Sequence, residues 1–477
     1  MKKLLSLFLS LVICTLILSV ITIGVSAANE VSVFDGTSVN KIATGSGTEA
    51  DPFIITKAAE LDYVATACMS GDTFAGKYIK LGVNINWGGR VWTPIGYTTT
   101  TVFSGNFDGN GKTIFNLTCT DTAVGIFAYA TGAVIKNLNI DYATFTTNTR
   151  YAGAIVALMR DSDISGCSGG ANVKIMTTDS MANTAQIGGL FGLVNNSTVK
   201  NCTFNGEVIV TSITGVSFIG GIAGVVGNNS EISFCVNNGI VRVTTPSTTG
   251  TSYAYAGGVV GGIGSSSVVG TIKNCINTGE VIAIEYAGGI LGRVHVKDST
   301  MNDCYNVGMV SSTTAGFAAA IIGEIPSTAI LSGSYGVSSA TAPAAYAKGD
   351  AAAIDPNALK LATESEIMAL DGYKKIITSI ETNLPVFDKI DPDAATKSPV
   401  TQPPATEPTA VTTAVTTEPP ANTAETTAGS AESTTAPPAA ATTAEPVKSG
   451  GCASAFAGGA IIITVIFAGV VIFKRRG

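Results

Sequence analysis

The chain has 477 residues, long enough for a large core, and its formal net charge is −7 at pH 7. Only 13% of the residues are charged, and glycine, which occurs 54 times, is abundant. Because this composition leaves no basic patch to neutralise phosphates, it argues against nucleic acid as a partner.

Residues 1–27 have the layout of a cleaved secretory signal peptide. Lys2 and Lys3 precede a long apolar run, which ends in the small-residue segment Val25, Ser26 and Ala27. We therefore expect the mature chain to be exported.

Residues 28–120 are expected to form an N-terminal cap and the first coils of a repeat domain. A turn-rich segment, 45–52, leads into a strand at 53–55, and Thr56 is placed to N-cap a short helix. The apolar residues of that helix share one face at helical spacing: Ala58, Leu61, Val64, Ala65 and Cys68. Such a helix would cover the open end of the core and its unpaired strand edge.

Two sets of residues in this region are candidates for a binding site. Asp108, Gly109, Asn110 and Gly111 resemble part of a calcium loop, but further acidic ligands are missing, and the pattern predicts a hairpin or coil corner. A second set consists of aromatic residues that could stack on a sugar but are better explained by packing beneath the cap: Trp87, Trp92, Tyr97 and Phe103.

Residues 121–338 contain one short pattern seven times. Its second small residue, followed each time by an aliphatic one, occurs at spacings of 29, 35, 32, 37, 31 and 31 residues: Gly125, Ala154, Gly189, Gly221, Gly258, Gly289 and Ala320. The copies are rich in Val, Ile, Thr and Gly and lack a sustained 3.6-residue period, which argues against helical repeats. Short strands at such a period predict a parallel β-solenoid, because no single copy can bury its own apolar face.

A second strand follows in each copy and is marked in five of them by cysteine: Cys167, Cys202, Cys235, Cys275 and Cys304. Equivalent positions in stacked coils lie about 4.8 Å apart, so we expect the thiols to stack as small buried hydrophobes. Disulfides between coils would suit an exported chain, but five cysteines cannot all pair and in-register stacking is poor disulfide geometry. Zinc is favoured least, since there is no CxxC motif and His295 is the only histidine.

Two further repeated positions leave alternatives open. Three asparagines that follow the cysteine strands either form a hydrogen-bonded ladder or serve as turn residues: Asn237, Asn277 and Asn306. The residue after each aliphatic position is also mostly large and apolar: Phe127, Val156, Phe191, Ala223, Val260, Leu291 and Ile322. In a regular strand this stripe would face outward as a binding patch or a covered surface. If the glycines bend the strand, both stripes lie inside.

The remainder of the chain predicts a cap, a stalk and an anchor. Residues 339–391 should form a C-terminal cap, with a helix at 359–370 and a short strand at 383–387. Residues 392–452 are rich in Thr, Pro and Ala and predict a disordered stalk. Residues 453–473 are apolar over the length of a transmembrane helix. Lys474, Arg475 and Arg476 make residues 474–477 a basic tail, which the positive-inside rule predicts to be cytoplasmic. This tail resembles the C-terminal anchor of Gram-positive wall proteins, but the LPxTG motif for covalent wall attachment is absent, so we expect a membrane-spanning anchor. Cys452, just outside the span, is interpreted as incidental.

The ordered motifs between residues 45 and 338 resemble the GLUG-motif bacterial surface proteins. They are GSGTxxDPFIIT at 45–56, AAEL at 58–61, GKYIKL at 76–81, WTPIG at 92–96, FSGNFDGNGKTI at 103–114, GGLFG at 188–192 and GGIAG at 220–224. The resemblance implies a right-handed parallel β-helix on a surface-attached chain. GLUG repeats also occur in IgA-specific metallopeptidases, whose zinc domain is separate, and no HExxH motif is present here to carry that activity over.

The sequence thus predicts an all-β, right-handed parallel β-helix with small helical caps, followed by a disordered stalk and one transmembrane helix. Its expected role is adhesion or ligand display at the cell surface, with an extracellular glycan or protein as ligand and no catalytic residues, cofactor or metal. The alternative is a carbohydrate-binding or carbohydrate-cleaving β-helix. For cleavage the candidates are Arg160, Asp161 and Asp163, although a solvated turn explains them more simply.

Overall fold

The computed structural model describes residues 30–178, 184–211, 215–244, 253–264, 268–326, 329–339, 341–349, 354–355, 357–387 and 390. All of them belong to the first of two compact units, residues 1–401. The predicted signal peptide, stalk and membrane helix lie outside the described residues. Within the described ranges, no helix is long and apolar enough to span a bilayer.

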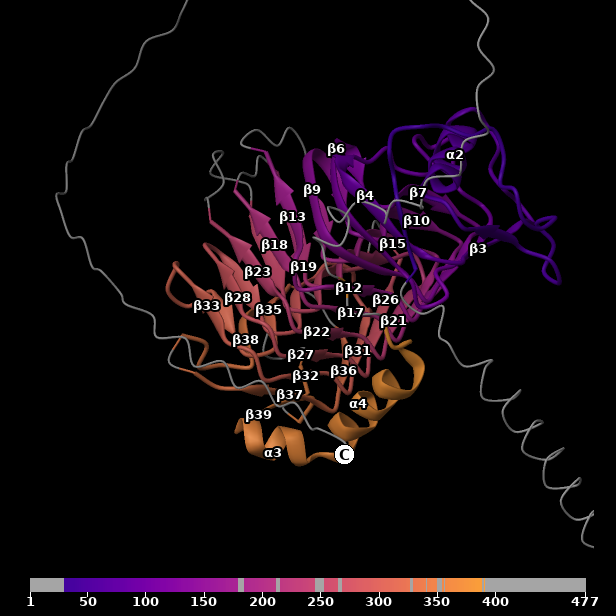
Figure 1. The fold of residues 1–477 in the computed structure, drawn as a ribbon. Helices are drawn as coiled ribbons and strands as arrows, with labels where there is room; N and C mark the ends of the chain where they lie inside the picture. The colour runs from indigo at the N-terminus through magenta and orange to yellow at the C-terminus, as the bar shows by residue number, and fades with distance from the viewer. Residues whose placement is uncertain are drawn as a thin grey trace, which may run out of the picture. The chain divides into compact units, whose positions relative to one another are not determined.

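The described chain is mostly β, and its strands form three parallel sheets, here called A, B and C (Figure 1). Sheet C contains β7 (Phe127–Thr131), β10 (Val156–Arg160), β15 (Phe191–Asn195), β20 (Ala223–Gly227), β25 (Val260–Ile263), β30 (Leu291–Val294), β35 (Ile322–Ile325) and β38 (Tyr346–Gly349). Sheet B contains β2 (Phe53–Ile55), β3 (Tyr78–Leu81), β5 (Asn106–Asp108), β8 (Val134–Lys136), β11 (Asp163–Ser165), β16 (Thr198–Lys200), β21 (Ser230–Ser233), β26 (Gly270–Lys273), β31 (Thr300–Asn302) and β36 (Ile330–Ser332).

Sheet A is the largest and receives up to three short strands from each coil. It contains β1 (Val31–Val33), β4 (Asn84–Val91), β6 (Thr113–Val124), β9 (Asn139–Ala152), β12 (Ser168–Gly169), β13 (Val173–Thr177), β14 (Gln186–Gly188), β17 (Thr203–Phe204), β18 (Glu207–Val210), β19 (Ser217–Gly220), β22 (Val236–Asn237), β23 (Ile240–Val243), β24 (Ala254–Gly257), β27 (Ile276–Asn277), β28 (Val281–Ala283), β29 (Tyr286–Gly288), β32 (Tyr305–Asn306), β33 (Val310–Ser312), β34 (Ala318–Ala319), β37 (Ser334–Val337) and β39 (Leu359–Ala362).

The strand register follows the sequence repeat. Val156 of β10 pairs with Phe127 of β7 on one side and with Phe191 of β15 on the other, so each strand lies beside its own copies. The chain passes from sheet C to sheet B and then through sheet A before the next coil begins. This pairing confirms the predicted repeat and is that of a parallel β-solenoid. Sheet C also continues one coil beyond residue 338, because β38 pairs with β35.

Both apolar stripes of the repeat lie in the core. The second stripe, from Phe127 to Ile322, is fully buried, as is the aliphatic stripe beside it. The interpretation as an outward apolar patch is therefore wrong. The reason is a corner: β14 ends sheet A at Gly188 and β15 starts sheet C at Phe191, so the chain bends between the two stripes. A Cβ atom at Gly189 would lie 2.2 Å from the carbonyl oxygen of Gly221, so the bend requires glycine there.

The corner from sheet B to sheet A is made by a single residue in the left-handed region. Its φ is between 50° and 63° in seven successive coils: Asn137, Gly166, Asn201, Phe234, Asn274, Asp303 and Gly333. Glycine, Asn and Asp tolerate this conformation best, which explains most of the set. The residue that follows each corner points into the core, and in five coils it is the ladder cysteine.

Both predicted side-chain ladders form. All seven described cysteines are free and buried, which agrees with the thiol-core interpretation. Asn237 Nδ2 donates to Asn277 Oδ1 at 2.8 Å, and Asn277 Nδ2 donates to Asn306 Oδ1 at 2.8 Å. Each amide also donates to a backbone carbonyl two residues ahead, so the asparagines form a ladder and fix the turn.

Helix α2 (Ala58–Met69) is the predicted N-terminal helix, and all five expected positions are buried. Its cap differs from the expectation. The N-cap residue is Lys57, and the capping oxygens belong to Glu60, whose carboxylate accepts from the backbone N–H groups of Ala43, Thr56 and Lys57. Thr56 is thus held by the cap and does not supply it.

Two predictions for the C-terminal segment are corrected. Residues 359–362 are strand β39, because the edge of β37 is available for pairing, and the helix starts only at α3 (Glu364–Ala369). The strand expected at 383–387 is absent, since Asn383 is the last residue of α4 (Asp371–Asn383) and residues 384–387 are irregular. Helix α4 lies beside the C-terminal coils (Figure 1). There it buries Tyr373 and Ile376 against an apolar ladder on the outside of sheet A.

Candidate functional site

The outer face of sheet B carries two in-register columns of mostly polar side chains. Residues that alternate with the columns, such as Ile79 and Ile135, point into the core. The tyrosine column consists of Tyr78, Asn106, Val134, Asp163, Thr198, Glu231, Thr271, Thr300 and Ile330. The lysine column consists of Lys80, Asp108, Lys136, Ser165, Lys200, Ser233, Lys273, Asn302 and Ser332.

Two neighbouring hollows open on this face at its N-terminal end. The first, about 220 Å³, is lined by both columns and by the loop that precedes β2: Glu49, Pro52, Tyr78, Ile79, Lys80, Asn106, Phe107, Asp108, Val134 and Lys136. The second, about 270 Å³, continues along the sheet and is lined by Val134, Asp163, Ile164, Ser165, Thr198 and Lys200. Together they offer an aromatic ring, carboxylates, ammonium groups and hydroxyls to a ligand.

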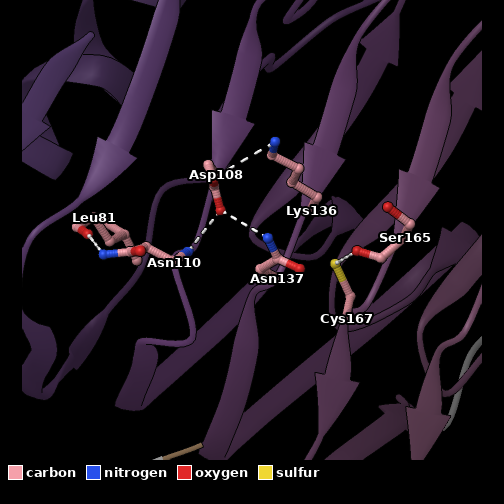
Figure 2. Close-up of polar contacts among 7 residues, drawn as sticks. All are labelled: Leu81, Asp108, Asn110, Lys136, Asn137, Ser165 and Cys167. Carbon is pink, nitrogen blue, oxygen red and sulfur yellow. Dashed lines mark hydrogen bonds and ion pairs between the residues drawn. The ribbon is translucent and has the colours of Figure 1, made fainter. Parts of the chain in front are cut away.

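Asp108 connects the first hollow to the coil corners (Figure 2). Its Oδ1 accepts hydrogen bonds from the Asn110 backbone N–H at 2.8 Å and from Asn137 Nδ2 at 3.1 Å. Its Oδ2 lies 3.6 Å from Lys136 Nζ. Asn110 and Gly111 have φ of 54° and 73°, so the segment is the predicted coil corner, and the Asp108 carboxylate stabilises it.

A second ion pair lies further along the same face. Lys273 Nζ is 2.7 Å from Glu231 Oε2, and Ser233 Oγ donates to Glu231 Oε1 at 3.0 Å. Partial burial raises the pKa of Glu231, but the Lys273 and Ser233 hydrogen bonds and the charges of Lys273 and Lys200 outweigh it. The net result is a pKa below the ordinary value, so Glu231 is ionised at neutral pH.

The three residues considered for cleavage surround one corner between sheets C and B. Arg160 ends β10, and Asp161 is the left-handed corner residue, with φ of 49° and a hydrogen bond from Asn196 Nδ2. Asp163 belongs to the tyrosine column and lines the second hollow. The structure therefore brings Asp163 to the candidate face, whereas Asp161 takes part in the turn.

Most of the aromatic residues considered for sugar stacking are core residues. Trp87, Trp92 and Phe103 are buried, and Trp87 stacks on Phe34 with ring centroids 4.0 Å apart. Tyr97 remains 37% exposed. The packing interpretation is confirmed for the three buried rings.

An aromatic ladder outside the main core was missed from the sequence. Phe218, Tyr255 and Tyr286 stack with centroids 5.6 and 5.0 Å apart, and the Arg293 guanidinium lies 4.8 Å from the Tyr255 centroid. The signal was present three residues before the second small residue of five copies: Tyr151, Phe218, Tyr255, Tyr286 and Phe317. The three stacked rings are almost fully buried in one cluster with Leu193 and Val225 of sheet C, so this ladder packs sheet A against sheet C. The same burial raises the pKa of Tyr255.

The described residues contain no group of three or more His, Cys, Asp or Glu side chains that could hold a metal ion. No family model matches the sequence. The chain is 28% identical to Halomucin of Haloquadratum walsbyi over 191 residues, which are 38% of this chain and 2% of Halomucin. It therefore spans a very small part of that protein.

Among solved structures, the chain is similar to a Bacteroides ovatus protein named provisionally as an immunoglobulin A1 protease. The two are 20% identical, with a TM-score of 0.42, and the match covers 68% of this chain and 89% of the other.

Proposed function

We propose that the chain is a membrane-anchored extracellular β-solenoid that acts as a surface adhesion or ligand-display module. The observation that carries the proposal is the outer face of sheet B. Its two columns run in register over nine strands, and two hollows lie in line at one end. A repeating polar face of this kind suits an extended ligand bound by surface complementarity.

Several finer assignments belong to this proposal. We infer that the coils are right-handed repeats of the GLUG type, that residues 392–452 form a stalk and that residues 453–473 anchor the chain in the membrane. This arrangement would hold the candidate face away from the cell surface. The membrane is then one partner, and an extracellular glycan or protein is the other.

A carbohydrate-binding or carbohydrate-cleaving function is the second candidate, and the first hollow favours it. Tyr78 supplies a ring for stacking on a sugar, while Asp108 and Lys136 supply an acceptor and donors for its hydroxyl groups. Cleavage would additionally require two carboxyl groups, one to protonate the leaving oxygen and one to act as nucleophile or to activate water, and Asp161 and Asp163 are the candidates for these roles.

The test is binding and turnover of the purified chain on arrays of glycans and matrix proteins, with and without Ca²⁺. Saturable binding without product supports the adhesion module. Time-dependent release of oligosaccharide that disappears in Asp161→Asn and Asp163→Asn variants would replace it with an enzyme. Absence of binding to every array would overturn both functions.

A further inference from the structure

The lysine column has a period of two strands. Lys80, Lys136, Lys200 and Lys273 lie on β3, β8, β16 and β26, which are the second, fourth, sixth and eighth strands of sheet B. The intervening strands place Asp108, Ser165 and Ser233 at the same position. Cationic and small hydrogen-bonding groups therefore alternate along the solenoid axis.

The alternation of lysines and small polar residues has a defined repeat distance along the sheet. Adjacent strands are about 4.8 Å apart, so successive lysines repeat every 9.6 Å or so along the sheet, and the four cover roughly 29 Å. One strand spacing is close to the length of one sugar in an extended polysaccharide, and two are close to a disaccharide. The lysine ammonium groups thus match one anionic group per disaccharide.

Two groups of the lysine column, one on each side of Lys136, fit the other half of such a repeat. The Ser165 hydroxyl can donate to and accept from the hydroxyls of an uncharged sugar, and the Asp108 carboxylate can accept from them, whereas Ser233 is buried and donates to Glu231. The carboxylates of Asp108 and Glu231 are each paired with a lysine of the column, at 3.6 and 2.7 Å. Both pairs are partly exposed at the surface of the sheet, where ion pairs contribute little to stability, so a ligand anion can compete for the lysine.

We propose that sheet B binds an extended acidic polysaccharide parallel to the solenoid axis, with one carboxylate or sulfate per disaccharide placed on each lysine of the lysine column. This inference rests on the proposed function, since it names the ligand class of the same face. The first hollow, where Glu49 and Tyr78 close the N-terminal end of the columns, receives the end of the bound polysaccharide.

The experiment uses the full-length chain and four polysaccharides. Hyaluronan carries one carboxylate per disaccharide, keratan sulfate carries about one sulfate and no carboxylate per disaccharide, polygalacturonate carries a carboxylate on every sugar, and dextran is uncharged. We expect hyaluronan and keratan sulfate to bind in a salt-sensitive manner, polygalacturonate to bind more weakly per charge, and dextran not to bind. The ratio of the first two affinities shows whether carboxylate or sulfate is preferred.

The decisive variants change charge on two different faces. Lys136→Gln with Lys200→Gln should weaken binding by roughly tenfold or more, because two charge-assisted contacts are lost. Lys174→Gln with Arg242→Gln makes the same change of net charge on sheet A, where both residues are about half exposed and paired with glutamates. This control should retain affinity within about twofold, and Lys136→Arg with Lys200→Arg should restore binding.

Equal losses in both Gln pairs would overturn the inference, since net charge alone would then explain binding. If the chain bound neutral glycans or proteins on the arrays but none of the three acidic polysaccharides, this inference would fail and the proposed function would stand. If it bound nothing in either experiment, both would fail.

Discussion

At the scale of single residues, Asn277 illustrates how a repeated polar side chain is accommodated inside the solenoid. It is fully buried, and its amide group bonds to an asparagine on each side and to the carbonyl of Gly279. Space for it comes from Gly258, where a Cβ atom would lie 2.3 Å from Asn277 Cγ. The same relation joins Gly221 to Asn237 and Gly289 to Asn306. The small residue of the repeat therefore has a packing role as well as a corner role.

Replacing Asn277 with alanine should lower the free energy of unfolding by about 2–4 kcal/mol. The change removes buried hydrogen bonds and leaves Asn237 Nδ2 and Asn306 Oδ1 short of a partner. Asn238→Ala is a matched control. Asn238 is the residue after Asn237 in the neighbouring coil, and its side chain donates to Asn205 and accepts from Thr278 in exposed hydrogen bonds. This change should cost less than about 1 kcal/mol. Denaturant unfolding monitored by circular dichroism measures both. Equal costs would contradict the role of the buried ladder.

Phe234 is the exception among the corner residues. A phenylalanine with φ of 52° is unfavourable, but its ring is half-buried in the cluster beneath α4 and lies 6.0 Å from Lys375 Nζ. The packing of α4 thus offsets the strain of the corner. Sequence reasoning cannot recover such a residue from the repeat, because its cause is a helix more than a hundred positions later in the chain.

At the scale of elements, α4 holds several coils together from outside. Its residues Tyr373 and Ile376 are buried against Val236, Ile276 and Tyr305, which lie on three successive coils. Beyond the helix, Pro385 comes close to the corners at Gly111 and Gly166. The segment 371–387 therefore runs along the stack and connects late coils with early ones.

Ile376→Ala should destabilise the fold by about 2–4 kcal/mol through lost burial and the resulting cavity. Lys374→Ala on the exposed side of the same helix should change stability by less than about 0.5 kcal/mol. Thermal and denaturant unfolding provide the measurement. If the two variants were equally stable, the packing of α4 on sheet A would not contribute to the stability of the fold.

The contact beneath α4 should also be sensitive to alkaline pH. Burial raises the pKa of Tyr305 to about 12, with smaller contributions from the charges of Asp303 and Cys304. Because the folded state retains this proton more tightly than the unfolded chain, where the pKa is near 10.0, the stabilisation is complete below that pH. It is lost as pH rises towards about 12.

Unfolding measured from about pH 9 to 11.5 should therefore show a steeper loss of stability in the wild-type chain than in Tyr305→Phe. The phenylalanine variant keeps the ring packing but has no proton to lose. Tyr253→Phe serves as the control, because Tyr253 is 40% exposed and should leave the slope unchanged. Identical slopes for all three proteins would contradict the assignment to Tyr305.

The repeated elements were predictable from sequence and the unrepeated ones were not, for a physical reason. In the coils, each residue packs against the equivalent residue of the next coil. A recurring residue such as Cys235 therefore indicates which side chains surround it. Residues 359–362 were predicted to be helical, yet they pair with β37, because strand formation there depends on an edge supplied by another coil. The candidate face was missed because its lysines alternate between coils, and a pattern with twice the period of the repeat becomes visible only in the strand register.

At the scale of the whole molecule, the described body behaves as a one-dimensional stack. Each strand pairs with its copies one coil before and one coil after it, and the columns on sheet B are produced by that pairing. Stability should then be close to a sum over coils and their interfaces. A complete coil can be removed without altering the remaining pairings, provided that the cut joins equivalent positions.

Deletion of residues 154–188 joins Gly153 to Gly189 and removes the coil that carries Ser165. We expect a folded protein in which Lys136 and Lys200 become neighbours about 4.8 Å apart, so that all four column lysines remain but their two-strand period is broken. Binding to hyaluronan should fall by roughly tenfold, since two lysines then compete for one anionic group. Deletion of residues 289–319 joins Gly288 to Ala320 and is the matched control, because it removes the coil of Asn302 beyond the last column lysine. It should retain wild-type affinity, and equal binding by the two deletion proteins would show that lysine number, and not lysine spacing, determines recognition.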